Sequence, residues 1–225
     1  METIIIIAID GPAGSGKSTI ANLIADRLKF DKLDTGAMYR AMAVYFLDKG
    51  IDSKDEEGIA RACGSVSVKI MYENGAQQVI LNGENVTSRL RTEEVGRMAS
   101  ATAVYASVRT KLVELQRELA AGTDVIMDGR DIGTCVLPDA TVKIYLTASV
   151  EARARRRYDE LVQKGETPQL SVIKEDIEKR DYNDMHRDIS PLRRAEDAHL
   201  VDSSDMDIDE VTATILDIFS SKIKN

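Results

Sequence analysis

The 225-residue chain has few cysteines, no excess of positive charge and no long hydrophobic run. Its two cysteines, Cys63 and Cys135, are far apart, and neither lies in a CxxC or a histidine-bearing cluster. A disulfide framework or a zinc site is therefore not expected. The net charge of −8 argues against nonspecific binding to nucleic acid. The apolar run Ile4–Ile9 is far shorter than the ~20 residues that span a bilayer.

These absences favour a protein of the cytoplasm that acts on small molecules. The first residues, Met1-Glu2-Thr3, lack the positive charge that begins a signal peptide. We expect a monomer that binds neither nucleic acid nor membrane. Residues 195–221 hold eight acidic residues and no Lys or Arg, and this segment is interpreted as the solvated face of a last helix. Hydrophobic residues make up 43% of the chain, enough for a core, so we expect a single domain over 1–225.

Short apolar strands alternate with helical stretches along most of the chain. Ile4–Ile9 is an unbroken β-branched run, typical of a strand buried on both faces of a parallel sheet. The other predicted strands are 30–33, 125–127, 142–146 and 199–201, and the predicted helices are 20–28, 38–48, 106–121, 150–164, 171–182 and 208–219. This alternation predicts an α/β doubly wound fold, with a parallel sheet flanked by helices.

One segment departs from this alternation. Residues 66–70 alternate with period two, 73–75 read as a hairpin turn, 78–81 as a second strand, and Asn82-Gly83 as another turn. A helical run follows from about Thr92. We therefore expect a small antiparallel β insertion at about 64–95.

The strongest motif is a phosphate-binding loop that follows the first strand and opens a helix. It matches G-x-x-x-x-G-K-[ST] in full. Its glycines allow successive backbone N–H groups to point at phosphate oxygens, and the helix start adds its positive dipole end. Lys17 is placed to reach the β and γ phosphates of ATP, and the Ser18 hydroxyl to help hold Mg²⁺. The predicted donor-binding residues are Gly11, Pro12, Ala13, Gly14, Ser15, Gly16, Lys17, Ser18 and Thr19.

A phosphate-binding loop alone does not choose among kinases, GTPases and ATPase motors. The N-K-x-D motif that GTPases generally use to read guanine is absent from the sequence. Motor ATPases usually need a longer chain and elements for an oligomer interface. The P-loop NTPase-type fold at this length therefore favours a small-molecule kinase.

An acceptor phosphate needs cations beyond the donor loop, and arginine pairs with phosphate in a bidentate way. Arg40 and Arg130 lie just beyond predicted strand ends, where ligands bind in α/β folds. Asp128 ends an apolar strand, which suits a carboxylate that holds Mg²⁺ through water or holds Ser18. Surface arginines or a turn-forming aspartate would fit the same pattern without any ligand.

A second cluster of charges and turn formers spans 179–188 and is followed by Ser190-Pro191. Upstream, the helix at 150–164 carries arginines at 153, 155, 156 and 157, which span more than one helical face. We expect a mobile lid at about 153–190 that excludes water around two polyanionic ligands, since a kinase must avoid hydrolysing ATP. No general base is assigned, because phosphoryl transfer depends mostly on positioning and charge neutralisation.

Over nearly its whole length the chain resembles bacterial-type cytidylate kinase, of the nucleoside monophosphate kinase group. The resemblance rests on 9–19, on Leu33-Asp34-Thr35-Gly36-Ala37-Met38-Tyr39-Arg40, on Asp128-Gly129-Arg130-Asp131-Ile132-Gly133-Thr134, and on 180–192. The loop is common to many families, whereas the second and third segments are much more specific. The β insertion is also similar to that family's enlarged monophosphate-binding region.

The resemblance implies transfer of the γ-phosphate of ATP to CMP, with Mg²⁺, and dCMP as a second acceptor. By this likeness Arg40, Arg130 and Arg187 grip the acceptor phosphate, and Thr35 lies in the same site. Ser100, Arg109 and Asp131 read the cytosine edge, whose amino donor and acceptors suit a carboxylate and an arginine. Arg180 and Asp184 face the ribose, and Arg153 and Arg157 lie in the lid near ATP. The predicted catalytic residues are Lys17, Arg130 and Asp128.

Two alternatives remain. The chain could be a kinase for another small acceptor, such as AMP, UMP, thymidylate or shikimate. It could instead be a nucleotide-binding module whose closure serves a partner protein. Such a module need not keep an acceptor cluster, so Arg40, Arg130 and Arg187 discriminate between the enzyme and the module.

Overall fold

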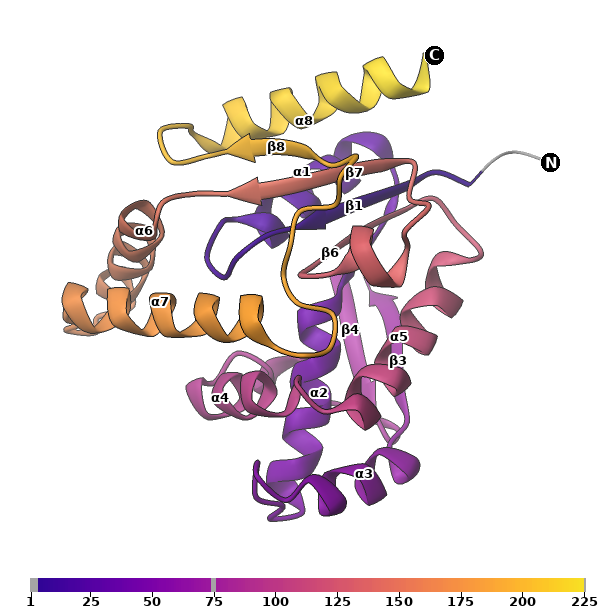
Figure 1. Cartoon of the computed structure of the whole chain (residues 1–225), viewed down its shortest axis with the longest axis vertical. Coiled ribbons are helices and arrows are strands. Elements are labelled where there is room, and N and C mark those ends of the chain that lie inside the picture. Colours follow the sequence, from indigo (N-terminus) through magenta and orange to yellow (C-terminus); the bar gives the residue numbers. More distant parts are fainter. Residues whose placement is uncertain (1–3, 74–75, 225) are drawn as a thin grey trace. The chain divides into compact units, whose positions relative to one another are not determined.

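A computed structural model describes residues 4–73 and 76–224, and within this range the chain forms two compact units. The first unit combines the chain up to Lys32 with the chain from Thr123 onward, and the second is Leu33–Gly122. Figure 1 shows the elements of both units, with colours that follow the sequence from indigo at the N-terminus to yellow at the C-terminus. The expectation of a single domain with a β insertion and a lid remains a prediction.

The first unit is built on a five-stranded sheet of order β2-β6-β1-β7-β8. Its strands are β1 Ile6–Asp10, β2 Asp31–Asp34, β6 Val125–Gly129, β7 Val142–Thr147 and β8 His199–Asp202. The pairs β1–β6, β1–β7 and β7–β8 are all parallel, and Asp10 lies opposite Gly129 on one side and Tyr145 on the other. The α/β class with a parallel sheet flanked by helices is therefore confirmed.

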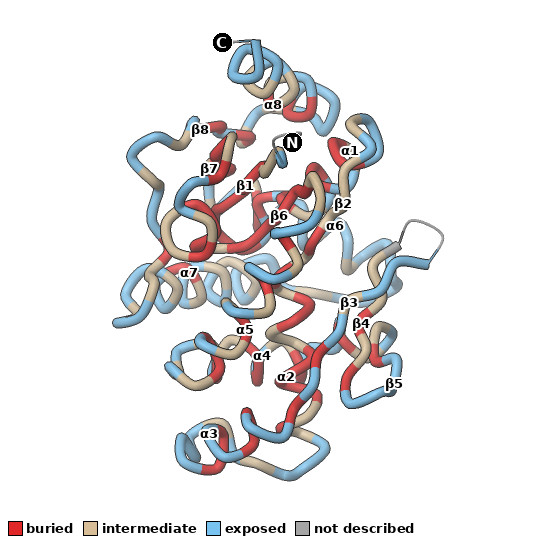
Figure 2. Tube along the Cα trace, turned by 90° about the vertical axis from the view of Figure 1, so that its right-hand side faces the viewer, coloured by how far each residue is buried: buried red, intermediate tan, exposed pale blue. Residues whose placement is uncertain are grey.

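Helices α1 (Lys17–Leu28) and α8 (Ile208–Ile223) cover one face of this sheet. Both present apolar residues at helical spacing, such as Ile20 and Ile24 in α1 and Val211 and Ile215 in α8. These side chains pack on alternate residues of β1, including Ile7 and Ile9, which are fully buried. The burial colours of Figure 2 follow the same core, with red running through β1, β6 and β7.

The other face of the sheet carries a single π-helical turn, η2 (Ile132–Val136), which contacts both β1 and β6. After β7 the chain forms α6 (Val150–Gln163) and α7 (Leu170–His186), which pack against each other in the region predicted as a lid. The Ser149 hydroxyl caps α6 by accepting a hydrogen bond from the Ala152 N–H. Helix α7 extends one turn beyond the predicted end at residue 182.

The second unit contains helices and the predicted small antiparallel sheet. Its elements are α2 Thr35–Asp48, α3 Glu56–Ser65, β3 Val68–Glu73, β4 Ala76–Leu81, β5 Glu84–Asn85, η1 Thr87–Arg89, α4 Glu93–Thr102 and α5 Ala106–Ala120. The sheet order is β3-β4-β5, and both pairs are antiparallel. The predicted turn at 73–75 includes residues 74 and 75, which lie outside the described residues.

The turn between β4 and β5 illustrates why this part of the chain forms a hairpin. Asn82 and Gly83 have φ of 48° and 92°, the left-handed conformation that a two-residue hairpin turn requires.

Helix α2 is the main buried element of the unit and packs against α3, α4, α5 and β4. Its start is fixed by Asp34, whose carboxylate accepts a hydrogen bond from the Ala37 N–H at 3.0 Å.

Candidate active site

The phosphate-binding loop connects the carboxyl end of β1 to the first residue of α1. Gly14 and Gly16 have φ of 76° and 88°, so the backbone takes the left-handed turns that the motif predicts. The Lys17 side chain is buried and its Nζ donates to the carbonyl of Pro12 at 2.6 Å and to the Ser15 hydroxyl at 3.3 Å. The amine therefore lies over the concave side of its own loop.

Burial, together with the positive charge of Arg130, lowers the pKa of Lys17 well below its ordinary value. Asp128, Asp10 and Asp184 act in the opposite direction but do not outweigh burial. A buried ammonium of this kind gains from an added anion, because opposite charge favours its protonated form. The N-terminus of α1, the glycine turns and this lysine form a set of donors that fits a phosphate chain. The loop therefore has the chemistry of a nucleotide phosphate site.

Ser18 and Asp128 lie side by side next to the loop. The Ser18 hydroxyl donates to the Asp128 carboxylate at 2.6 Å, and Asp128, the residue before the end of β6, is 3% exposed. Lys32 lies 3.4 Å from the other carboxylate oxygen of Asp128. Hydroxyl and carboxylate oxygens are the ligands that Mg²⁺ accepts beside substrate phosphates, so this pair fits the ion. Among the described residues there is no group of three His, Cys, Asp or Glu side chains that could hold a metal alone.

The predicted residues 130, 131, 180, 184 and 187 gather in the same unit, between β6 and α7. The Arg130 Nε donates to Asp184 at 2.8 Å, and Arg187 lies 3.3 Å from Asp131 and 4.0 Å from Asp184. Burial would raise the pKa of Asp184, but Arg130, Arg180 and Arg187 outweigh it and lower that pKa. Residues 130–131 and the charged segment 179–188, which the sequence presents as separate clusters, are thus in contact.

Arg153 and Arg157 occupy different environments on α6. Arg153 is 4% exposed, and its guanidinium donates to the carbonyls of Ala13 and Ala148 at 3.0 and 2.9 Å and pairs with Asp181 at 2.6 Å. Arg157 is half-exposed and pairs with Glu160 at 2.8 Å. Arg153 therefore joins the outer side of the donor loop to α7, whereas Arg157 faces away into solvent. Their predicted contacts with ATP stay predictions.

The second unit contains the remaining predicted residues. Thr35 is buried at the start of α2, and the Arg40 guanidinium lies over Gly36 one turn earlier on the same helix. Arg109 on α5 is 3% exposed, stacks 5.8 Å from the Tyr39 ring centre and donates to the Ala103 carbonyl at 3.4 Å. Ser100 is half-buried on α4, which packs against α2. The structure thus brings these residues together around α2.

Three charged residues with contacts to the loop or to Asp128, of which Asp10 and Asp181 are buried and Lys32 is partly buried, were not singled out from the sequence. Asp10 accepts the N–H groups of Ile132 and Gly133, Asp181 pairs with Arg153, and Lys32 approaches Asp128. Each acts through a partner far away in the chain, so spacing gives no signal for any of them. Asp10 is the exception in one respect, because a charged residue ending a buried β-branched strand is itself unusual.

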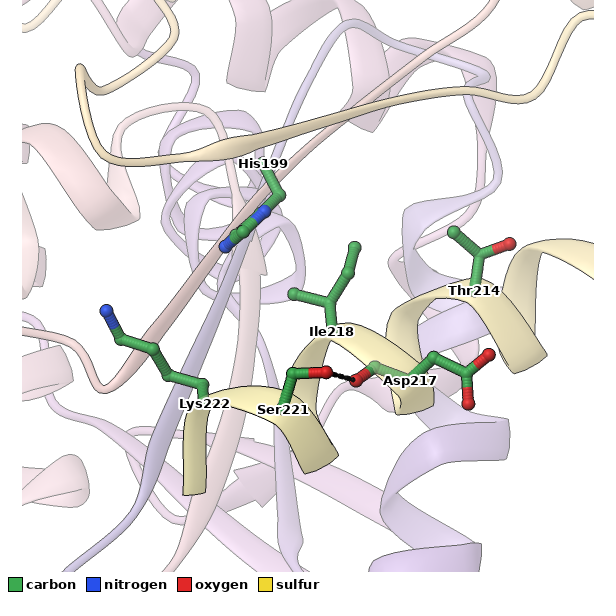
Figure 3. Close-up of a pocket in the computed structure, with 6 residues that line it drawn as sticks. All are labelled: His199, Thr214, Asp217, Ile218, Ser221 and Lys222. Atoms are coloured by element: carbon green, nitrogen blue, oxygen red, sulfur yellow. Dashed lines mark hydrogen bonds between the residues drawn. The ribbon is translucent and has the colours of Figure 1, made fainter. Parts of the chain in front are cut away.

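A pocket elsewhere in the first unit is lined by none of the predicted residues. It lies between β8 and α8, and its lining residues are His199, Thr214, Asp217, Ile218, Ser221 and Lys222. Figure 3 shows the exposed His199 ring turned toward α8, while the Ser221 hydroxyl donates to the Asp217 carbonyl within the helix. The pocket opens on the amino-terminal part of β8, whereas the donor loop follows the carboxyl end of β1.

The chain is similar to known proteins over most of its length. A family model described as Cytidylate kinase matches residues 7–221. The cytidylate kinase of Lactobacillus johnsonii is 48% identical over 97% of this chain and 95% of its own length. That of Carboxydothermus hydrogenoformans is 48% identical over 96% of this chain and 97% of its own.

Solved structures support the fold. A shikimate kinase from Bacteroides thetaiotaomicron has a TM-score of 0.51 at 10% identity, covering 97% of this chain and 99% of that one. A gluconokinase from Sinorhizobium meliloti has a TM-score of 0.50 at 11% identity, covering 98% and 94%. At these identities the likeness concerns the fold alone. No helix in the described part of the chain is long and apolar enough to cross a membrane.

Proposed function

Because the chain belongs to the cytidylate kinase family, we propose that it transfers the γ-phosphate of ATP to CMP, giving ADP and CDP, and uses dCMP as a second acceptor. The observation that carries the proposal is the presence of a complete donor loop and a cluster of partly buried, carboxylate-paired arginines in one compact unit. A nucleotide-binding module would need the loop but not the cluster.

The donor half of the reaction is assigned to the loop and to β6. Backbone N–H groups of 11–16 and the start of α1 hold the phosphates of ATP, and Lys17 neutralises charge on the transferred group. Ser18 and Asp128 hold Mg²⁺, Asp128 directly or through water. Bound there, the ion neutralises charge that develops on the phosphate oxygens.

The acceptor half is assigned to arginines, which can pair with a phosphate in a bidentate way. Arg40, Arg130 and Arg187 bind the phosphate of CMP, and Thr35 lies in the same site. In the structure Arg130 and Arg187 are partly buried and paired with carboxylates, which compensates their charge. An acceptor phosphate would take over part of this pairing with its own charge.

Base and sugar recognition complete the assignment. Ser100, Arg109 and Asp131 read the cytosine edge, and Arg180 and Asp184 bind the ribose. A site built to hydrogen-bond the amino group of cytosine discriminates strongly against a base that lacks it, because buried polar groups are then left unpaired. We therefore propose that UMP is a much poorer acceptor than CMP.

The phosphoryl transfer needs no dedicated general base. The acceptor oxygen belongs to a phosphate, which is already anionic, so the residues mainly hold the two reacting groups in line and neutralise charge. Exclusion of water is assigned to the region 153–190, where α6 and α7 pack together. The lid role of this region is supported by its position beside the donor loop through Arg153.

We also propose that the protein acts as a monomer in the cytoplasm on small-molecule substrates, without nucleic acid or membrane. The net charge of −8 supports the absence of nucleic acid. Light scattering coupled to gel filtration measures the state in solution, and the mass of one chain is expected. The mass of two chains would overturn the monomer without affecting the proposed reaction.

The reaction is tested by coupled ADP release with Mg·ATP and each of CMP, dCMP, UMP, AMP, dTMP and shikimate at equal concentration. Strong turnover with CMP and dCMP alone is expected. Turnover with a different acceptor would keep the donor site but overturn the roles of Ser100, Arg109 and Asp131. Asp131→Ala should raise the KM for CMP more than the dissociation constant of ATP, and equal losses would contradict its role in base reading.

A further inference from the structure

Asp10 occupies an unusual place for a charged residue. It is the last residue of β1, it precedes the donor loop directly, and it is 5% exposed. Its two carboxylate oxygens accept hydrogen bonds from consecutive backbone N–H groups, those of Ile132 at 2.8 Å and Gly133 at 2.7 Å. A carboxylate that receives one N–H on each oxygen fixes both the position and the direction of the segment it binds.

The two N–H groups belong to the first residues of the turn η2, which have no acceptor within the turn itself. The residue before them, Asp131, stands at the N-cap, where an aspartate ordinarily accepts such N–H groups with its own side chain. Asp131 makes no capping hydrogen bond here, and its carboxylate instead lies 3.3 Å from Arg187. Asp10 therefore supplies the cap that Asp131 would otherwise supply.

We propose that Asp10 is a positioning residue for the acceptor: by capping η2 it releases the Asp131 carboxylate to the acceptor site and holds Arg130 and Asp131 at a fixed place beside the donor loop. This inference rests on the proposed function, in which those two residues bind CMP. Asp10 itself touches neither substrate. It acts through the backbone of 130–133, which joins β6 to η2.

Gly133 supports the same arrangement from the other side. A Cβ at this position would lie 3.4 Å from the Asp10 carboxylate and 3.1 Å from Cδ of Lys143 on β7. Glycine thus permits the close approach between the turn and the end of β1. An added methyl group would crowd the Lys143 side chain and lie in van der Waals contact with the carboxylate, which provides a second, milder means of disturbing the cap.

The electrostatic environment of Asp10 makes the proposed cap dependent on pH, which an experiment can follow. Burial raises the pKa of Asp10 to about 6, although the two N–H groups and Lys17 act in the opposite direction. Asp131 adds to the increase, and Lys143, which packs nearby, directs its ammonium to Asp197. Below about pH 6 the protonated carboxyl keeps one good acceptor oxygen, so the cap is weaker in acid.

The test compares the wild type with Asp10→Asn, whose amide resembles the protonated carboxyl. At about pH 8 we expect the KM for CMP to rise about tenfold in the variant, because a charged acceptor is lost, while the KM for ATP changes less than about threefold. At about pH 5.5 the wild type loses the same advantage, so the two KM values for CMP should converge. Taking the ratio of variant to wild type removes the ionisation of the CMP phosphate, whose own pKa is about 6.

Asp124→Asn is the matched control. Asp124 also accepts a backbone N–H of the first strand region, that of Ile5 at 2.7 Å, but at the amino end of the sheet. Asp124→Asn should lose about as much stability as Asp10→Asn does. Its KM values for CMP and ATP should stay near those of the wild type, and the ratio of its KM for CMP to that of the wild type should be the same at both pH values. Circular dichroism checks that each variant is folded.

Gly133→Ala keeps the proposal testable where Asp10→Asn does not fold. It should likewise raise the KM for CMP more than the KM for ATP. Any of three results for Asp10→Asn would overturn the proposal. The first is a ratio of variant to wild-type KM for CMP that is the same at both pH values. The others are an equal rise in the KM values for CMP and ATP, and an unchanged KM for CMP in the folded variant. If the wild type instead used another acceptor, the proposed function would fail, and the same ratios measured with that acceptor would still decide the role of Asp10.

Discussion

Gly11 marks the point where the backbone of the donor loop passes closest to the sheet. Its φ is 151°, and a Cβ at this position would lie 1.9 Å from the carbonyl oxygen of Leu146 and 3.0 Å from its carbonyl carbon. Leu146 is fully buried in β7, and the contact is with backbone, so no flexible side chain can move aside. In Gly11→Ala the cost of overpacking, about 1–3 kcal/mol, adds to backbone strain of about 1–3 kcal/mol.

We therefore expect Gly11→Ala to lower the free energy of unfolding by about 4 kcal/mol, which corresponds to a fall in Tm of about 12 °C for a chain of this size. The assay is thermal unfolding followed by circular dichroism. Gly16→Ala is the matched control, because Gly16 has φ of 88° in the same loop and a Cβ there would meet nothing within 4 Å. It should lose only the strain of a left-handed residue, about 1–2 kcal/mol. Equal losses in the two variants would refute the contact with Leu146 as the cause.

Three further changes test the site. Lys17→Ala should fold yet lose turnover by about 10²-fold or more, since it removes charge stabilisation of the transferred phosphate, and near-normal kcat would contradict its role. Asp181→Ala leaves the buried Arg153 guanidinium without its carboxylate and should cost about 3–5 kcal/mol in thermal unfolding, whereas replacing both with leucine should recover part of the loss. The pKa of Asp10 is raised from 3.8 to about 6, so the folded state binds the extra proton between these values and stability should fall by roughly 3 kcal/mol as pH rises through this window. Asp10→Asn should lack that component, and identical pH–stability curves for the two proteins would contradict it.

The strands and most helices could be predicted because burial on both faces of a parallel sheet leaves a plain pattern. Ile4–Ile9 covers β1 except for Asp10, and the strands at 125–127, 142–146 and 199–201 lie within β6, β7 and β8. Helix α3 was not predicted. It holds two glycines in ten residues, and its apolar face is only Ile59, Ala62 and Cys63. The signal that could have found it is Asp55, which caps the helix by accepting the Gly58 N–H at 2.9 Å.

The candidate site likewise contains residues that the sequence could predict and residues that it could not. The place of the donor loop between β1 and α1, and its left-handed turns, could be predicted because they depend on consecutive residues. The contacts of Asp10, Lys32 and Asp181 could not, since each is created only in the folded chain. The same holds for Arg153, whose guanidinium contacts two carbonyls and a carboxylate that no spacing predicts.

Two buried charges hold the donor loop from different sides. Asp10 joins the start of the loop to the turn that carries Asp131, and Arg153 joins the carbonyl of Ala13 to α7 through Asp181. Lysine could not replace Arg153, because a single ammonium cannot reach two carbonyls and a carboxylate in the fixed fork that a guanidinium provides. The loop is thus joined by hydrogen bonds to the turn that follows Asp131 on one side and to α7 on the other. A change in the position of the loop would therefore act on both of these segments through the two buried charges.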